Sequence, residues 1–114
     1  MSMKLTTRDV SGVSIVDLSG KITLGEGGVA LREEVRKLLA EGKKKIVLNL
    51  AEVNYIDSSG LGELVSSYTA VKNAGGELKL LNLTSKVRDL LGITKLVTVF
   101  DVKDDEASAV SSFA

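Results

Sequence analysis

The chain of 114 residues has no cysteine, no histidine and no proline, and its only aromatic residues are two tyrosines and two phenylalanines. Without cysteine there is neither a disulfide nor a thiol nucleophile, and without cysteine and histidine the usual zinc sites are excluded. Histidine is also the most common general base at neutral pH. We therefore expect no metal site and no cofactor, and we predict that the protein is not an enzyme.

Neither sign of charge is in excess, because 15 Lys and Arg balance 15 Asp and Glu. A chain without net charge lacks the basic surface that nucleic acids and acidic membranes attract. No apolar run approaches the roughly 18 residues of a membrane span, and the first four residues, MSMK, begin no signal-peptide core. We expect a cytoplasmic protein with no nucleic-acid partner and no membrane insertion.

Short apolar runs alternate with amphipathic stretches along the chain. The apolar runs predict strands at residues 4–9, 13–18, 46–50, 78–83 and 96–100, with a turn at Ser11 and Gly12 that makes a hairpin of the first two. Helical spacing predicts helices at residues 29–41, from the turn at 57–59 to about 73, from about 85 to 92, and from 104 onward.

Strands that alternate with helices form parallel sheets with right-handed crossovers. We therefore predict an α/β fold over residues 1–114, as one domain. It consists of a mixed, mostly parallel β-sheet with an N-terminal hairpin and about four helices packed on it. Residues on the apolar faces of the central elements should form the core, namely Leu48, Leu50, Leu64, Val65 and Leu80.

Residues 25–28, with the sequence GEGG, are predicted to form a flexible loop before the first helix. Glycine-rich loops cradle phosphates in nucleotide-binding proteins. The glycines here are followed by no Gly-Lys-Ser/Thr and form no G-x-G-x-x-G, so the pattern favours a plain loop.

Asp57, Ser58 and Ser59 lie in the turn between the predicted strand 46–50 and the following helix. The first backbone N–H groups of a helix lack partners, and the helix dipole is positive there. Small hydroxyls at this place cap helices. They are also exposed to a kinase, and the residues alone do not separate capping from signalling.

Two other chemistries for this turn meet obstacles in the sequence. A serine nucleophile needs a base, normally histidine, and a G-x-S-x-G elbow, and neither is present. A receiver-like phosphorylation of Asp57 needs an acidic pair to hold Mg²⁺ and a lysine after the last strand. The first strand supplies only Asp9, and Lys103 follows the last one. Asp57 also lies well beyond Leu50, the expected strand end.

Residues 55–62, with the sequence YIDSSGLG, resemble the signature of the STAS domain, and specifically of bacterial anti-sigma factor antagonists. The strand before them, the segment 75–78 (GGEL) and the order of elements fit the same pattern, so the resemblance covers essentially the whole chain. It implies that the unmodified protein binds an anti-sigma factor that is also a serine kinase. The kinase would phosphorylate Ser58, and a PP2C-type phosphatase would reverse the modification.

The resemblance also implies a partner-binding surface, consisting of Asp57, Ser58, Ser59, Gly60, Leu61 and Gly62 with Gly25, Glu26 and Gly27 of the loop. In many antagonists that loop is polar and often contains histidine, so residues 25–28 depart from the family and leave the identity of the partner open. A second STAS class, the accessory subunits of lipid-transport ATPases, binds partners without phosphorylation and is the alternative.

Overall fold

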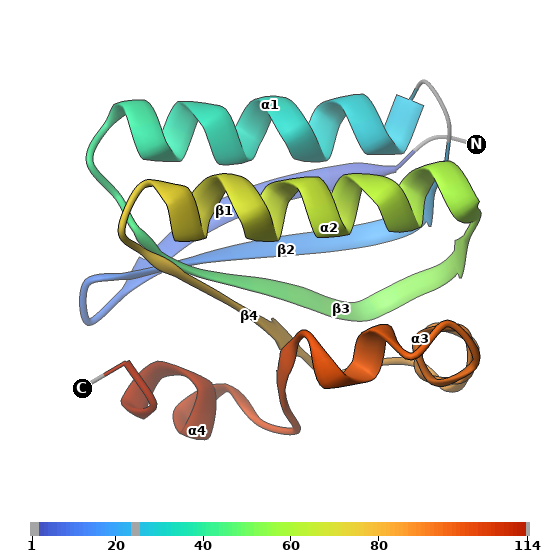
Figure 1. Cartoon of the computed structure of the whole chain (residues 1–114). Helices are drawn as coiled ribbons and strands as arrows, with labels where there is room; N and C mark the ends of the chain where they lie inside the picture. The colour runs from blue at the N-terminus through green and yellow to red at the C-terminus, as the bar shows by residue number, and fades with distance from the viewer. Residues whose placement is uncertain (1–2, 24–25, 114) are drawn as a thin grey trace.

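A computed structural model describes residues 3–23 and 26–113, which form a central sheet with helices on both faces (Figure 1). The strands are β1 Lys4–Val10, β2 Val13–Ile22, β3 Lys45–Ile56, β4 Glu77–Leu81 and β5 Asp101–Lys103. The helices are α1 Glu26–Ala40, α2 Ser58–Asn73, α3 Ser85–Ile93 and α4 Glu106–Ser111, with a 3₁₀ turn, η1, at Leu96–Thr98. None of the helices described is long and apolar enough to cross a membrane.

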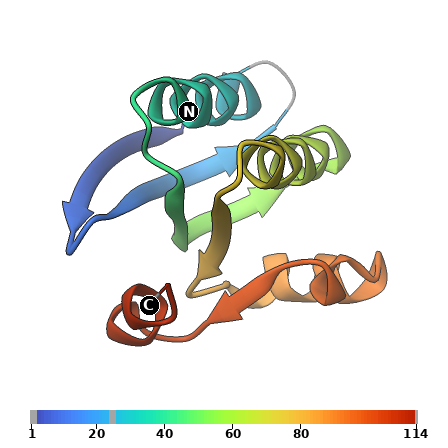
Figure 2. The same cartoon turned by 60° about the vertical axis from the view of Figure 1, so that its left-hand side comes forward.

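The sheet has five strands in the order β1-β2-β3-β4-β5. β1 pairs antiparallel with β2, and each later pair is parallel. Helices α1 and α2 lie side by side on one face, while α3 and α4 lie on the other (Figures 1 and 2). The predicted α/β fold, with its mostly parallel sheet, N-terminal hairpin and four helices, is confirmed.

The hairpin turn follows from two backbone conformations. Ser11 and Gly12 have φ of 53° and 82°, and positive φ at both central residues gives the turn whose twist matches that of the flanking strands. The Gly12 N–H also donates to Asp9 Oδ1 at 3.1 Å. The predicted hairpin is therefore present, and its turn lies at the end of the sheet where β3 begins (Figure 1).

Most of the predicted core is buried. Leu48, Leu50, Leu64 and Leu80 are 0% exposed and belong to one cluster that joins the sheet with α1, α2 and α3. Val65 is only half-buried, so its prediction was wrong. Val65 packs against the core cluster from the margin of the buried stripe of α2, which consists of Gly60, Leu61, Leu64, Ser67 and Val71.

Residues 96–100 are not the last strand, and this prediction was also wrong. Lys95 has a φ of 65° and turns the chain into η1, where Val99 N–H donates to Leu96 O at 2.9 Å. Of this apolar run, Phe100 is buried against Tyr68, with ring centroids 5.4 Å apart. The strand follows at β5, where Val102 pairs with Leu80.

Candidate functional site

The candidate site lies where β2 and β3 end and α2 begins. β3 continues to Ile56 instead of ending at Leu50, because residues 52–56 pair with the extended end of β2. Register shifts interrupt this pairing, which breaks the alternation of buried and exposed residues that would have revealed the strand. Asp57 therefore follows the strand directly, and the expectation that it lies far beyond the strand end is wrong.

Asp57 caps α2. Its backbone is extended, with φ −98° and ψ −178°, and its Oδ1 accepts the Gly60 N–H at 2.7 Å. Its carbonyl accepts the first helical hydrogen bond, from Leu61 N at 2.8 Å. The proposal that the small hydroxyls cap this helix is thus corrected, because the carboxylate reaches the third N–H of the helix. A negative charge at this end also complements the helix dipole.

Ser58 and Ser59 are the first two residues of α2, and both are exposed. Neither hydroxyl takes part in a hydrogen bond within the described part of the chain. Since Asp57 supplies the cap, the start of the helix does not depend on either hydroxyl. They are accessible to a protein that approaches the carboxyl end of β3.

The glycines of the motif differ in what surrounds them. A Cβ on Gly60 would overlap the carbonyl oxygen of Ile22, so only glycine lets α2 start this close to β2. A Cβ on Gly62 would meet nothing within 4 Å, so this residue keeps part of the outer surface flat. Leu61 is 7% exposed, and its side chain belongs to the core.

The segment predicted as a flexible loop is largely helical. Gly25 lies outside the described residues, but α1 begins at Glu26, and Gly27 and Gly28 form its first turn. A Cβ on Gly27 would overlap the Lys21 carbonyl, and Gly28 N–H donates to Thr23 O at 3.0 Å. The glycines thus allow close packing of this helix start on β2, which composition alone does not show.

Gly27 and Gly60 pack against successive carbonyls of β2, those of Lys21 and Ile22. The structure therefore brings the starts of α1 and α2, the two segments predicted to bind a partner, to the same strand end. Both glycines are buried beneath the exposed residues of this surface and let the two helix starts pack closely on β2. From Asp57 to Gly62, the exposed residues are Ser58, Ser59 and Gly62.

A shallow groove of about 640 Å³ between α1 and α2 adjoins Ser59. Arg32, Arg36, Glu63 and Ser66 line it together with Ser59 and Gly62. The Arg32 guanidinium pairs with Glu63, Nη1 to Oε2, at 2.6 Å. Arg36 is exposed, and within the described residues it has no ion pair. Sequence reasoning missed this groove, although the two arginines are four residues apart on one helix face.

Tyr55 is a second feature that sequence reasoning did not place in the site. It lies on β3 just before the cap and is 45% exposed. Its register partner on β2 is Lys21, whose Nζ lies 5.9 Å from the centre of the Tyr55 ring. Tyrosine is one of the residue types enriched among the side chains that dominate binding at protein interfaces.

Asp9 and Asp57, two of the residues of the receiver-like alternative, lie at opposite ends of the sheet. Asp9 lies at the hairpin, where it pairs with Ser14 at the beginning of β2, whereas Asp57 follows the end of β3. Lys103 forms an ion pair with Asp101 at 3.3 Å. Across residues 3–23 and 26–113, no three acidic side chains are grouped so that they would hold a metal ion.

A family model described as the STAS domain matches residues 4–109. An anti-sigma-B factor antagonist of Bacillus subtilis is 37% identical over 87 residues, which are 76% of this chain and 78% of that protein. An anti-sigma F factor antagonist of Paenibacillus polymyxa is 26% identical over 111 residues, 97% of this chain and 95% of the relative.

Solved structures with the same fold include an anti-sigma factor antagonist from Mycobacterium paratuberculosis. It has a TM-score of 0.86 and 23% identity, covering 98% of this chain and 94% of that one. The Bacillus cell fate determinant SpoIIAA in its phosphorylated form has a TM-score of 0.74 and 18% identity, covering 97% of this chain and 100% of that one. The names of these proteins describe regulators, which bears out the prediction that this chain is not an enzyme.

Proposed function

The chain belongs to the STAS domain family, and we propose that it acts as an anti-sigma factor antagonist. In this role it binds an anti-sigma factor at the start of α2 and thereby frees a sigma factor. The names of its relatives support the role. The observation that carries it is that the exposed hydroxyls after the Asp57 cap form no hydrogen bond with any residue that the structure describes.

The partner in this proposal is also a serine kinase, and Ser58 is the residue that it phosphorylates. Ser58 is the first residue of α2, is exposed and directly follows Asp57. A PP2C-type phosphatase restores the hydroxyl. Phosphorylation adds about −1.5 to −2 charges and three acceptor oxygens at this position.

The helix start explains how such a charge changes binding without unfolding the domain. The dipole and the free N–H groups of the first turn favour an anion there. Across an interface, however, the phosphate must lose its water and lies beside the carboxylate of Asp57. A loss of about 3 kcal/mol of binding energy lowers the affinity more than a hundredfold.

The partner-binding surface of this proposal centres on Asp57, Ser58, Ser59 and Gly62. Buried Gly60, Leu61 and Gly27 support it. The proposal also keeps Gly25 and Glu26 from the surface that the sequence resemblance implies. We add Tyr55 and Arg36, because both are exposed and adjoin the turn or the groove next to it. An aromatic ring and an arginine are the side chains that most often carry binding energy at interfaces.

The test is phosphorylation by a serine-kinase anti-sigma factor from the same genome. Wild type, Ser58→Ala and Ser59→Ala are incubated with the kinase and ATP, and the phosphate is located by mass spectrometry. The proposal expects phosphate on wild type and on Ser59→Ala, both at Ser58, and none on Ser58→Ala. Modification of Ser59 in wild type would overturn the residue assignment, and a complete lack of binding to such kinases would overturn the role.

A further inference from the structure

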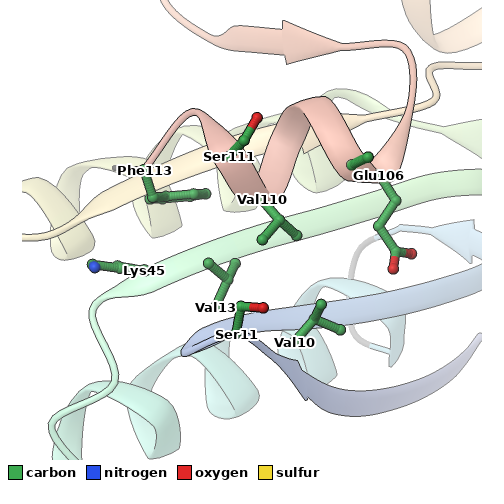
Figure 3. Close-up of a pocket in the computed structure, with 9 residues that line it drawn as sticks. Val10, Ser11, Val13, Lys45, Glu106, Val110, Ser111 and Phe113 are labelled. Atoms are coloured by element: carbon green, nitrogen blue, oxygen red, sulfur yellow. The ribbon is translucent and has the colours of Figure 1, made fainter.

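An apolar pocket of about 620 Å³ lies at the end of the sheet opposite to Ser58 (Figure 3). We propose that this pocket binds a medium-chain carboxylate, such as an eight- to ten-carbon acid. β3 connects the two places, because Lys45 at its start lines the pocket and Ile56 at its end precedes the cap. The proposal does not rest on the function inferred for Ser58.

The walls of the pocket come from the hairpin and α4. Val10 and Val13 lie below, and Val110 and Phe113 lie above them (Figure 3). The Lys79 ammonium, 4.7 Å from the ring centre of Phe113 and 3.0 Å from Asp101 Oδ2, holds that ring in place. The volume falls within the range of about 300 to 1,000 Å³ that is usual for sites of small ligands.

The polar groups of the pocket select an anionic head group. Lys45 is exposed at the rim and forms no ion pair within the described residues. Glu106, at the other end, has both carboxylate oxygens taken by Arg8, at 2.6 and 3.0 Å. Arg8 thus balances the charge of Glu106, which leaves Lys45 as the charged residue of the lining without an ion pair in the described part of the chain. A carboxylate head group accepts what the Lys45 ammonium donates.

The surroundings favour a small molecule over a protein partner. The large hydrophobic side chains that are exposed in the described part of the chain are Tyr55, Ile93, Val97 and Val99, and none of them lines this pocket. Ser11 and Ser111 form part of the rim instead. A protein interface surrounds its centre with further contact area, whereas an isolated apolar hollow matches a short aliphatic acid when, as here, one of its two charged lining residues, Glu106, is already paired with Arg8.

The experiment is an NMR titration of the ¹⁵N-labelled chain with octanoate, with octylamine as the ligand of opposite charge. Saturable shifts should be confined to the amides of Val10, Val13, Lys45, Val110 and Phe113. Lys45→Gln should raise the Kd for octanoate about three- to fivefold, as expected for an exposed ion pair. Lys44→Gln, the exposed neighbour that does not line the pocket, should leave it unchanged.

A variant whose pocket is filled by a larger side chain provides a second test of the proposal. Ala107 is an exposed residue of α4 that lines the pocket, so Ala107→Phe should block octanoate while the chain stays folded. Absence of saturable shifts in wild type would overturn the proposal, as would octylamine that binds as tightly as octanoate. Line broadening of the same amides with protein concentration alone would show that a second copy occupies the pocket instead, and this too would overturn it.

Discussion

The Asp57 carboxylate accepts the Gly60 backbone N–H at 2.7 Å, and this bond starts α2 directly after β3. The aspartate supplies the cap, and the glycine lets the helix lie against the Ile22 carbonyl. Asp57 and Gly60 therefore determine how the helix starts, and the two hydroxyls between them, of Ser58 and Ser59, stay exposed. Substitutions of these residues should separate the structural positions from those of the proposed switch.

Loss of the cap should lower stability. Asp57→Ala removes the acceptor of the Gly60 N–H, and we expect a loss of about 0.5–2 kcal/mol in the free energy of unfolding. Asp57→Asn keeps an acceptor and should lose less. Ser58→Ala, whose hydroxyl makes no hydrogen bond in the described structure, should unfold like wild type. Urea unfolding of the three variants measures this, and a larger loss for Ser58→Ala than for Asp57→Ala would contradict the cap assignment.

The two glycines of the motif should respond to alanine in opposite directions. Gly60→Ala forces a Cβ onto the Ile22 carbonyl, and overpacking of this kind costs about 1–3 kcal/mol. Gly62→Ala meets nothing within 4 Å and replaces a helical glycine, so it should stabilise by up to about 1 kcal/mol. Thermal unfolding compares them directly, and equal effects would show that the close approach of α2 to β2 is not as described.

The inward face of α2 should be visible in a pair of truncations. Leu64 is 0% exposed, and Leu64→Ala should cost about 2–5 kcal/mol through lost burial and the cavity left behind. Val65 is half-buried, so Val65→Ala should lower the free energy of unfolding clearly less. Denaturant unfolding gives both values. A larger loss at Val65 would mean that α2 presents a different face to the sheet.

Acid should weaken the cluster formed by Arg8, Asp17 and Glu106. Hydrogen bonds from Arg8 lower the pKa of both carboxylates, so the unfolded chain binds more protons than the folded one at acid pH. The cluster adds its full stability above the ordinary pKa values, which are 3.8 for Asp17 and 4.5 for Glu106. This stability is lost as the pH falls through the lowered pKa values of the folded protein.

Arg8→Met should therefore lose more stability relative to wild type at about pH 7 than at about pH 3. Arg88→Met is the matched control, because Arg88 pairs at 3.5 Å with Asp104, whose side chain is 88% exposed. That control should differ little from wild type at either pH. Urea unfolding at the two pH values tests the prediction. If Arg8→Met lost as much unfolding free energy in acid as at neutral pH, the effect of Arg8 would come from packing and not from charge.

Local signals in the sequence predicted the features that local physics decides. The positive φ of Ser11 and Gly12 follows from turn chemistry, and the apolar spacing from Leu61 to Val71 follows from helix periodicity. The place of the motif at a helix start, between strand and helix, was predicted for the same reason. These features depend on residues that are close together in the chain.

The features that sequence reasoning missed depend on contacts between distant segments. Glycines at the start of α1 are typical of a loop, and only the nearness of the Lys21 carbonyl explains why this helix has glycine in its first turn. The register shifts against β2 hide the last part of β3. Asp57 and Ser58 are both good caps by residue type, so backbone geometry alone decides between them. Arg36 enters the groove only because α1 and α2 lie side by side.

The central claim, that a phosphate on Ser58 controls partner binding, is tested most directly by titration calorimetry against the cognate kinase. Ser58→Ala should bind like wild type, and protein phosphorylated at Ser58 should bind more than a hundredfold more weakly. Ser58→Asp carries one charge only and should lie between them, and Ser59→Asp should weaken binding less than Ser58→Asp. All four proteins should keep melting temperatures within a few degrees of wild type. Equal affinity of the phosphorylated and unmodified proteins would contradict the account.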